Sequence, residues 1–239
     1  MSKVIIILMM CAAAAVAQRA GKVLYYQAGG DDPQHAYIYQ NGYPVLNGGA
    51  QLKQELPRWN FSKVFEIAPQ TVTLTFHPEP LDLAEQMPMK APKVTIPEEW
   101  ERFLILCVKD PKNKYMPIKL YAINASNNAF KPGDLYFINF TDVRVEGKLG
   151  ESTLVLPPYK KVNVDGKGTT NGRDCVARLN YLNAKTGESK PFIRQSWGHT
   201  GTVRRVVFIF KKPNGRLSYY VTSIQDFETS AERKAQSRS

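Results

Sequence analysis

Short segments in which apolar and polar residues alternate recur along nearly the whole chain. In Asp142-Val143-Arg144-Val145-Glu146, the two valines would share one face of a strand and the charged side chains the other. A period of two, bounded by glycine, proline and asparagine, predicts strands with one buried and one solvated face, as in an antiparallel sandwich. The segments are Lys22–Gln27, Ala36–Gln40, Tyr43–Leu46, Lys63–Ala68, Thr71–His77, Phe103–Lys109, Pro117–Asn124, Asp134–Phe140, Asp142–Glu146, Ser152–Leu156, Lys160–Val164, Cys175–Leu182, Pro191–Ser196, Val203–Phe210 and Arg216–Ile224.

The turns and the scarcity of helical patterns point to the same fold class. Asn41-Gly42 and Asn214-Gly215 are typical two-residue hairpin turns, and Gly147-Lys148-Leu149-Gly150 is expected to be a longer turn of this kind. The helical candidates, Asp82–Met87 and Pro97–Phe103, are both too short to carry a core. The sequence therefore predicts an all-β protein.

The chain has 239 residues, of which 43% are hydrophobic, so it can form one large domain or two small ones. Corresponding features follow one another in the same order in its two parts. Residues 102–111 and 204–213 both read as arginine, an apolar strand and a Lys-x-Pro turn, about 100 residues apart. A period of that length fits a sandwich of seven or eight strands per copy. The alternative is that any two hairpins look alike.

The first seventeen residues have the three parts of a secretory signal peptide. Met1-Ser2-Lys3 is a short basic region, Val4–Val16 is apolar, and Ala15-Val16-Ala17 is a cleavage site before Gln18. The alternative is a retained anchor helix, but the apolar run is short for a membrane span. We therefore expect cleavage between Ala17 and Gln18 and an exported protein, periplasmic or extracellular, that does not span the membrane.

The chain carries 32 Lys and Arg against 21 Asp and Glu, a formal net charge of +11. A basic exported protein can meet an anionic polysaccharide of the envelope or another envelope protein. The sequence has no aromatic-basic signature of an RNA-binding sheet, so we expect no nucleic acid partner. The basic pairs Lys160-Lys161, Arg204-Arg205 and Lys211-Lys212 are dispersed along the chain. The alternative is therefore that the basic residues bind no specific partner and only keep the surface soluble. The sequence does not indicate an oligomeric state.

The second part of the chain resembles a group of exported bacterial proteins of uncharacterised function with immunoglobulin-like β-sandwich domains. The resemblance lies mainly in residues 131–226: a strand that ends in Asn139-Phe140-Thr141, the Gly147–Gly150 segment and the strand closed by Pro157-Pro158. It implies an exported immunoglobulin-like sandwich and brings no catalytic residue with it.

With the repeat, this resemblance leads us to expect two tandem immunoglobulin-like antiparallel β-sandwich domains after a cleaved signal peptide at residues 1–17. The first domain would span residues 18–129, with an insertion around Asn47–Asn60 and a proline-rich loop. The second would span residues 130–227, and residues 228–239 would form a flexible tail.

Motifs for catalysis or metal binding are missing from the sequence. The three histidines, His35, His77 and His199, are far apart, and neither H-x-x-H nor C-x-x-C occurs. No G-x-S-x-G, H-E-x-x-H or phosphate-binding glycine loop is present. We therefore expect no cofactor, no metal and no enzymatic activity. An all-β hydrolase whose carboxylates meet in space, for example from Asp31-Asp32 and Glu98-Glu99, is the alternative.

The strongest candidate for a binding site is Trp197-Gly198-His199, with Arg194 before it and Arg204-Arg205 after it. This cluster is expected in a turn at one end of the second sandwich, where such folds often bind ligands. Tryptophan can stack on a sugar ring, and arginine can bind a carboxylate or phosphate. The alternative is that Trp197 closes the end of the core.

Two cysteines, Cys107 and Cys175, remain once residues 1–17 are removed. Export and an even number favour a disulfide, but the repeat places the two residues in different cores. A disulfide needs Cα atoms within about 7 Å. We therefore expect two free, buried thiols.

Overall fold

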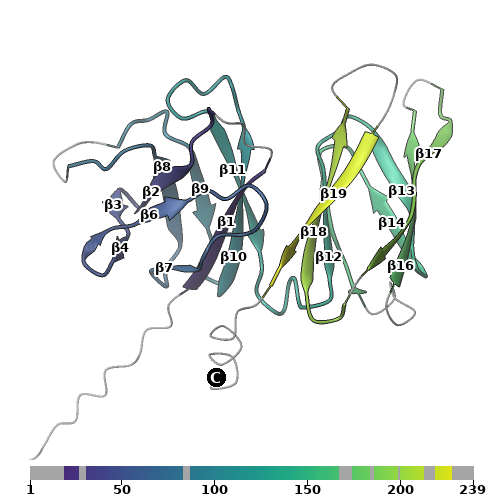
Figure 1. Cartoon of the computed structure of the whole chain (residues 1–239), viewed down its shortest axis with the longest axis horizontal. Coiled ribbons are helices and arrows are strands. Elements are labelled where there is room, and N and C mark those ends of the chain that lie inside the picture. Colours follow the sequence, from purple (N-terminus) through teal and green to yellow (C-terminus); the bar gives the residue numbers. More distant parts are fainter. Residues whose placement is uncertain are drawn as a thin grey trace, which may run out of the picture.

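The computed structural model describes residues 19–26, 31–82, 87–166, 174–183, 186–198, 200–212 and 219–227. All regular elements in these residues are strands, as the alternating pattern predicts. Figure 1 shows the strands in two groups, with those of the first half of the chain on the left and those of the second half on the right. Residues 1–18, which contain the expected signal peptide and cleavage site, and the tail from residue 228 lie outside the described part.

The first half contains two larger sheets and a small hairpin. Its inner sheet, which faces the second half, has the order β11-β10-β1-β7, with β1 Arg19–Tyr26, β7 Phe65–Ile67, β10 Arg102–Lys109 and β11 Ile118–Asn124. Its outer sheet has the order β3-β2-β8-β9, with β6 also paired to β2, and comprises β2 His35–Gln40, β3 Tyr43–Pro44, β6 Lys53–Glu55, β8 Val72–His77 and β9 Lys93–Ile96. The hairpin is β4 Leu46–Asn47 with β5 Ala50–Gln51.

The second half contains two four-stranded sheets. Its inner sheet has the order β15-β12-β18-β19, with β12 Leu135–Asn139, β15 Lys161–Val164, β18 Arg204–Lys211 and β19 Tyr219–Asp226. Its outer sheet has the order β14-β13-β16-β17, with β13 Arg144–Leu149, β14 Ser152–Leu156, β16 Asp174–Leu182 and β17 Ser189–Gly198. Pro191 lies in the edge strand β17 beside a register shift in its pairing with β16, and edge strands and bulges are the places where a sheet tolerates proline.

The expectation that all strand pairs are antiparallel is wrong at two places. β1 pairs in parallel with β10, and β12 pairs in parallel with β18. Both inner sheets are therefore mixed. A parallel pair joins segments that are distant in sequence, so no local turn pattern indicates it.

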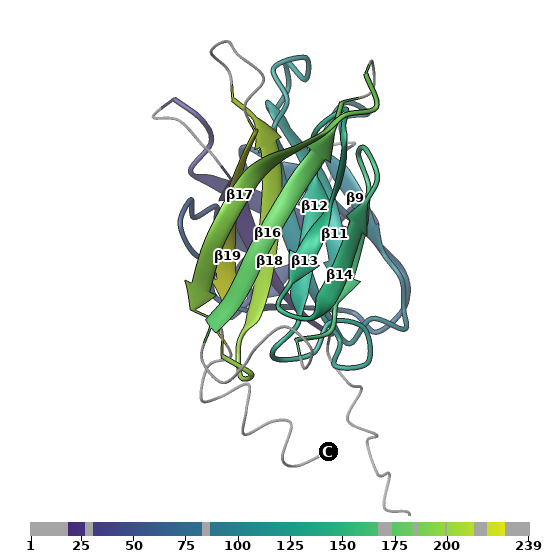
Figure 2. The same ribbon diagram turned by 90° about the vertical axis from the view of Figure 1, so that its right-hand side faces the viewer.

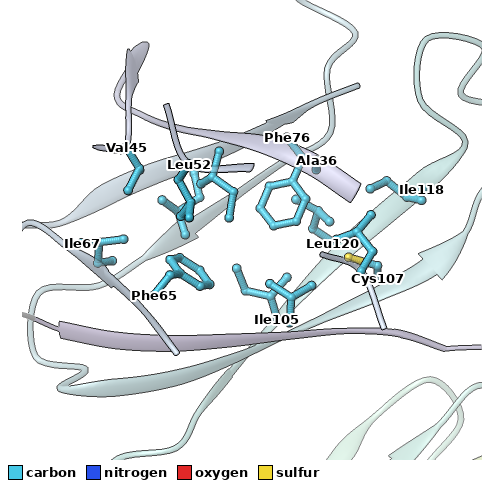
Figure 3. Packing of buried hydrophobic residues seen from close by; sticks show 14 of the residues in the cluster. Ala36, Val45, Leu52, Phe65, Ile67, Phe76, Ile105, Cys107, Ile118 and Leu120 are labelled. Carbon is cyan, nitrogen blue, oxygen red and sulfur yellow. The ribbon is translucent and has the colours of Figure 1, made fainter. Parts of the chain in front are cut away.

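Each half has a hydrophobic core between its two sheets. In the first half, Val23, Ile105 and Cys107 of the inner sheet pack with residues such as Ile38 and Phe76 of the outer sheet. Figure 3 shows the side chains of Ile105, Cys107 and Phe76 pointing into the space between the sheets. In the second half, the core includes Leu135, Phe137, Val207 and Ile209 of the inner sheet and Val145, Leu154, Cys175 and Leu179 of the outer sheet. The inward residues alternate with exposed ones along β16, as its period of two predicts.

A third hydrophobic cluster joins the two inner sheets. Leu24, Leu104 and Leu106 of the first half pack in one cluster with Val206 and Phe208 of the second. Tyr26 lies with its ring centroid 4.8 Å from that of Phe208 and 4.9 Å from that of Phe210. The central strands β1, β10, β12 and β18 are thus buried on both faces over most of their length, and the molecule is a stack of four sheets.

Local structure differs from the sequence expectation at several places. The segment 147–150 is not a turn: β13 continues to Leu149, and Leu149 pairs with Ser152, so the turn lies at residues 150–151. Pro97–Phe103 is not a helix: a short turn, with a bond from the Trp100 N–H to the Pro97 carbonyl, leads directly into β10. Three strands lie outside the predicted segments: β5 and β6 lie in the expected insertion, and β9 lies in the proline-rich stretch.

The Asn41-Gly42 hairpin is as expected, with φ of 50° and 88° at its two residues. The second expected hairpin turn, Asn214-Gly215, lies outside the described residues. In the described part of the chain, no helix is long and apolar enough to span a membrane.

Candidate binding surface

Trp197 packs against the second core. It lies in β17 opposite Cys175 of β16, and its ring centroid is 6.3 Å from that of Phe137, with an angle of 29° between the planes. The indole is only partly exposed, and its Nε1 donates a 3.3 Å hydrogen bond to Oε1 of Gln195. These contacts are those of a residue that closes the end of a sandwich. Its neighbour His199 lies outside the described residues.

Arg204 is buried between the two halves, with 1% of its surface exposed. Its Nε donates to the Phe130 carbonyl at 2.6 Å, and its Nη1 lies 3.6 Å from Oδ2 of Asp226. The other oxygen of Asp226 accepts a 2.9 Å hydrogen bond from Nζ of Lys22. Arg204 is therefore held inside the protein and does not face a ligand in solvent.

Arg205 lies on the opposite face of β18 from Arg204, because neighbouring residues of a strand alternate. Its Nη2 donates to the Gly198 carbonyl at 2.5 Å, so the side chain is hydrogen-bonded to the end of β17. Burial lowers the pKa of Arg205 below its usual value. The structure therefore does not bring Trp197, Arg194, Arg204 and Arg205 together in one site.

Arg194 instead belongs to a row of cations on the exposed face of the outer sheet of the second half. It lies directly opposite Arg178 of β16, and Arg178 lies directly opposite Lys148 of β13. All three side chains are exposed. Figure 2 shows this sheet facing the viewer, with β17, β16, β13 and β14 side by side. Since neighbouring strands are about 4.8 Å apart, the row extends for roughly 10 Å across the strands. We call Lys148, Arg178 and Arg194 the cationic row.

No carboxylate among the described residues forms an ion pair with any member of the cationic row. The nearest acid along β13, Glu146, is 3.5 Å from Nε of Arg144, which is its own partner. Like charges directly opposite one another destabilise a sheet by a few tenths of a kcal/mol or more per pair. An anion bound along the row would relieve this repulsion.

β13 and β16 approach each other closely at Gly147, next to the row. A Cβ atom at Gly147 would lie 2.0 Å from the carbonyl oxygen of Arg178, so only glycine fits there. Lys148 follows immediately and points to the outer face, while Leu149 points to the core. The register thus places the amine of Lys148 and the guanidinium of Arg178 on neighbouring strands.

Sequence reasoning identified Arg194 but missed Lys148 and Arg178. Lys148 continues the outward positions of Arg144 and Glu146, and this signal was available in the alternation. The Gly147–Gly150 segment, which is typical of a turn, hides this alternation. The pairing of β13 with β16 joins segments some 30 residues apart, and nothing in the sequence fixes its register.

The remaining candidate residues lie apart from this face. Cys107 and Cys175 are both buried and are not joined by a disulfide, since the first lies in the core of the first half and the second in that of the second half. Burial raises the pKa of the Cys107 thiol well above its usual range. Among the described residues, no three His, Cys, Asp or Glu side chains are grouped closely enough to hold a metal ion.

The chain matches no protein-family model, and it shows no significant similarity to a curated protein. The candidate surface therefore stands on its geometry.

Proposed function

We propose that the protein is an exported, non-enzymatic binding module that attaches to an anionic polysaccharide of the cell envelope through the cationic row. The main observation in support is that Lys148, Arg178 and Arg194 lie directly opposite one another on neighbouring strands of an exposed sheet face. A row of regularly spaced cations suits a polymer that carries one acidic group per sugar ring. Cleavage after Ala17 removes only one cation, Lys3, from the chain's formal net charge of +11, so the exported form stays strongly basic and attracts the same partner at long range.

Export is supported by the composition of residues 1–17, with a basic start, an apolar run and a small-residue cleavage site. A periplasmic or extracellular protein meets envelope polysaccharides directly. A protein anchored on such a polymer can also serve as a structural or adaptor module, and that role would use the same surface.

We further propose that the chain consists of two tandem immunoglobulin-like domains that arose by duplication. The order of strands supports this. In both inner sheets the last strand, the penultimate strand and the first strand of that half follow one another, as β11-β10-β1 and as β19-β18-β12. The pairing of the first with the penultimate strand is parallel in both halves.

Binding to polygalacturonate, a polymer of uronic acid, tests the proposed function. We expect the triple variant Lys148→Gln, Arg178→Gln, Arg194→Gln to bind this polymer on the order of 100-fold more weakly than the wild type. The reason is that each cation near an anionic surface contributes about 1 kcal/mol, and 1.4 kcal/mol corresponds to a tenfold change. Isothermal titration calorimetry at low salt measures the difference.

The matched control removes three exposed lysines of the first half, Lys63, Lys90 and Lys112, by the same change to glutamine. It alters the net charge equally and should keep most of the affinity. Equal losses in the two triple variants would show that net charge alone binds the polymer, and the cationic row would have no special role. Single-stranded DNA serves as a second probe, and binding as tight as that of polygalacturonate would contradict the choice of polysaccharide.

A further inference from the structure

A second candidate site lies in the first half, around Trp59. This side chain is 80% exposed, more than any other tryptophan in the described part of the chain. It borders a hollow of about 660 Å³ whose other walls are Gln34, His35, Lys53, Glu55, Leu56, Pro57 and Arg58. A volume of this size is within the range of small-ligand sites.

The hollow is built on a fixed backbone. The Leu56 N–H donates to the Gln34 carbonyl at 2.8 Å, and the Tyr25 N–H donates to the Pro57 carbonyl at 2.8 Å. On the other side of Trp59, Oγ of Ser62 accepts a 2.9 Å hydrogen bond from the Val23 N–H. Trp59 thus projects from a short segment that is tied to β1 at both ends. The folded protein thus holds the exposed indole of Trp59 in place, and a ligand can bind it without reorganisation of the backbone.

The walls of the hollow supply donors and acceptors of several kinds. His35 of β2 lies directly opposite Glu55 of β6, and Lys53 lies two residues before Glu55 on the same face. Burial, with a contribution from Lys53, lowers the pKa of His35, so its ring is neutral at neutral pH and can both donate and accept. Lys53 and Arg58 outnumber Glu55 among the charged groups, so the site favours an anionic ligand.

An aromatic face beside polar groups is the arrangement that recognises a sugar. The apolar face of a pyranose ring packs on the indole, and the hydroxyls bond to amide, carboxylate and imidazole groups. We infer that the Trp59 hollow is a second binding site that takes a uronic acid residue, with its ring on Trp59, its hydroxyls toward Gln34, His35 and Glu55, and its carboxylate toward Lys53 or Arg58. The inference does not depend on the cationic row.

Calorimetric titration of the full-length protein with trigalacturonate tests this site. The wild type is expected to bind the trisaccharide saturably with one equivalent at this site. Trp59→Ala should weaken binding at least tenfold, whereas Trp59→Phe, which keeps a ring, should lose less. Tyr43→Ala is the control, because Tyr43 is also strongly exposed, at 72%, but does not border the hollow. Both substituted positions are strongly exposed, and unchanged urea unfolding verifies that the three variants fold.

The charge preference is tested with maltotriose, a neutral trisaccharide. We expect the wild type to prefer trigalacturonate to maltotriose, and Arg58→Gln to reduce this preference severalfold. The absence of saturable trigalacturonate binding, or equal affinity in the wild type and Trp59→Ala, would overturn the inference. The same holds if Tyr43→Ala causes an equal loss, because binding would then be unspecific stacking.

The cationic-row triple variant separates this site from the proposed function. It should bind trigalacturonate at the Trp59 hollow with an affinity close to that of the wild type while losing polygalacturonate affinity. A different outcome would contradict the inference: the triple variant loses affinity for both trigalacturonate and polygalacturonate, while Trp59→Ala loses affinity for neither. The trisaccharide would then bind at the cationic row and not at the Trp59 hollow.

Discussion

At the scale of single residues, Asn139 shows how one buried polar side chain fixes the local chain path. It is 1% exposed at the end of β12. Its Nδ2 donates to the carbonyls of Val143 at 2.8 Å and Pro157 at 3.0 Å. Its Oδ1 accepts from the N–H of Thr141 at 3.0 Å and from the hydroxyl of Thr141 at 2.6 Å. One amide therefore ties the start of β13 and the end of β14 to the inner sheet.

We predict that Asn139→Ala lowers the free energy of unfolding by about 3 kcal/mol, because it leaves several buried donors and acceptors without partners. Urea unfolding followed by circular dichroism measures the loss. Asn60→Ala, at an exposed asparagine, should change stability by less than about 0.5 kcal/mol. Similar losses in both variants would show that the hydrogen bonds of Asn139 have no special weight.

The residues of the expected Trp197 site show where sequence reasoning stops at this scale. Alternation predicts that Arg204 and Arg205 point to opposite faces of β18, and they do. It does not tell which faces are buried, because a second sheet can cover either one. Arg204 lies under the first half, 3.6 Å from Asp226, and so a residue expected to bind a ligand has a structural contact. Packing between segments that are distant in sequence decides which face of a strand is buried.

At the scale of elements, the pairing of β13 with β16 places Lys148 beside Arg178 on the candidate surface. At Gly147, an added Cβ would lie 2.0 Å from the carbonyl oxygen of Arg178, a backbone atom that cannot move aside alone. The next residue, Lys148, is the first member of the cationic row. Gly147 and the first member of the cationic row are thus neighbours on one strand.

Gly147→Ala is predicted to destabilise the protein by about 2–4 kcal/mol, because the two strands must separate to admit the methyl group. It should also weaken polygalacturonate binding, since Lys148 and Arg178 would no longer be aligned. Gly198→Ala is the control: a Cβ at this position of β17 meets no atom within 4 Å. If Gly147→Ala is as stable as the wild type, the tight approach of β13 and β16 is not real.

Most strands could be predicted from the sequence, because alternation and turn residues are local signals. The expected range Cys175–Leu182 differs from β16 by only one residue, and Ser152–Leu156 coincides with β14. β9 was missed because its stretch is rich in proline, although an edge strand of four residues tolerates proline on either side. The parallel pairs and the register of the cationic row are set by distant segments and could not be predicted in this way.

At the scale of the whole molecule, the cluster between the inner sheets holds the two halves together. Lys22 of β1 reaches across to Asp226 of β19 with Nζ 2.9 Å from Oδ1, and both side chains are buried. A buried ion pair is costly to break by removing one partner, because the remaining charge stays in an apolar setting. The continuous apolar runs in β10 and β18 carried a signal for this interface, since strands buried on both faces do not alternate.

We predict that a fragment of residues 130–227 folds alone but self-associates. Its own core lies between its two sheets, whereas Ile138, Val206 and Phe208 lose their cover when the first half is removed. Circular dichroism should show a β-rich spectrum with a cooperative transition, and sedimentation velocity should show dimers or larger species. An unfolded fragment would mean that the two halves depend on one shared core, and the proposed division into two domains would be wrong.

The salt dependence of polygalacturonate binding tests the central claim most directly. If the cationic row binds the polymer, each contact releases counterions, and the logarithm of the affinity falls linearly with the logarithm of the salt concentration. We predict that the triple variant of Lys148, Arg178 and Arg194 has a slope smaller in magnitude by about two to three than that of the wild type, and that the control variant of Lys63, Lys90 and Lys112 keeps most of the wild-type slope. Equal slopes for the wild type and the cationic-row variant would contradict the account.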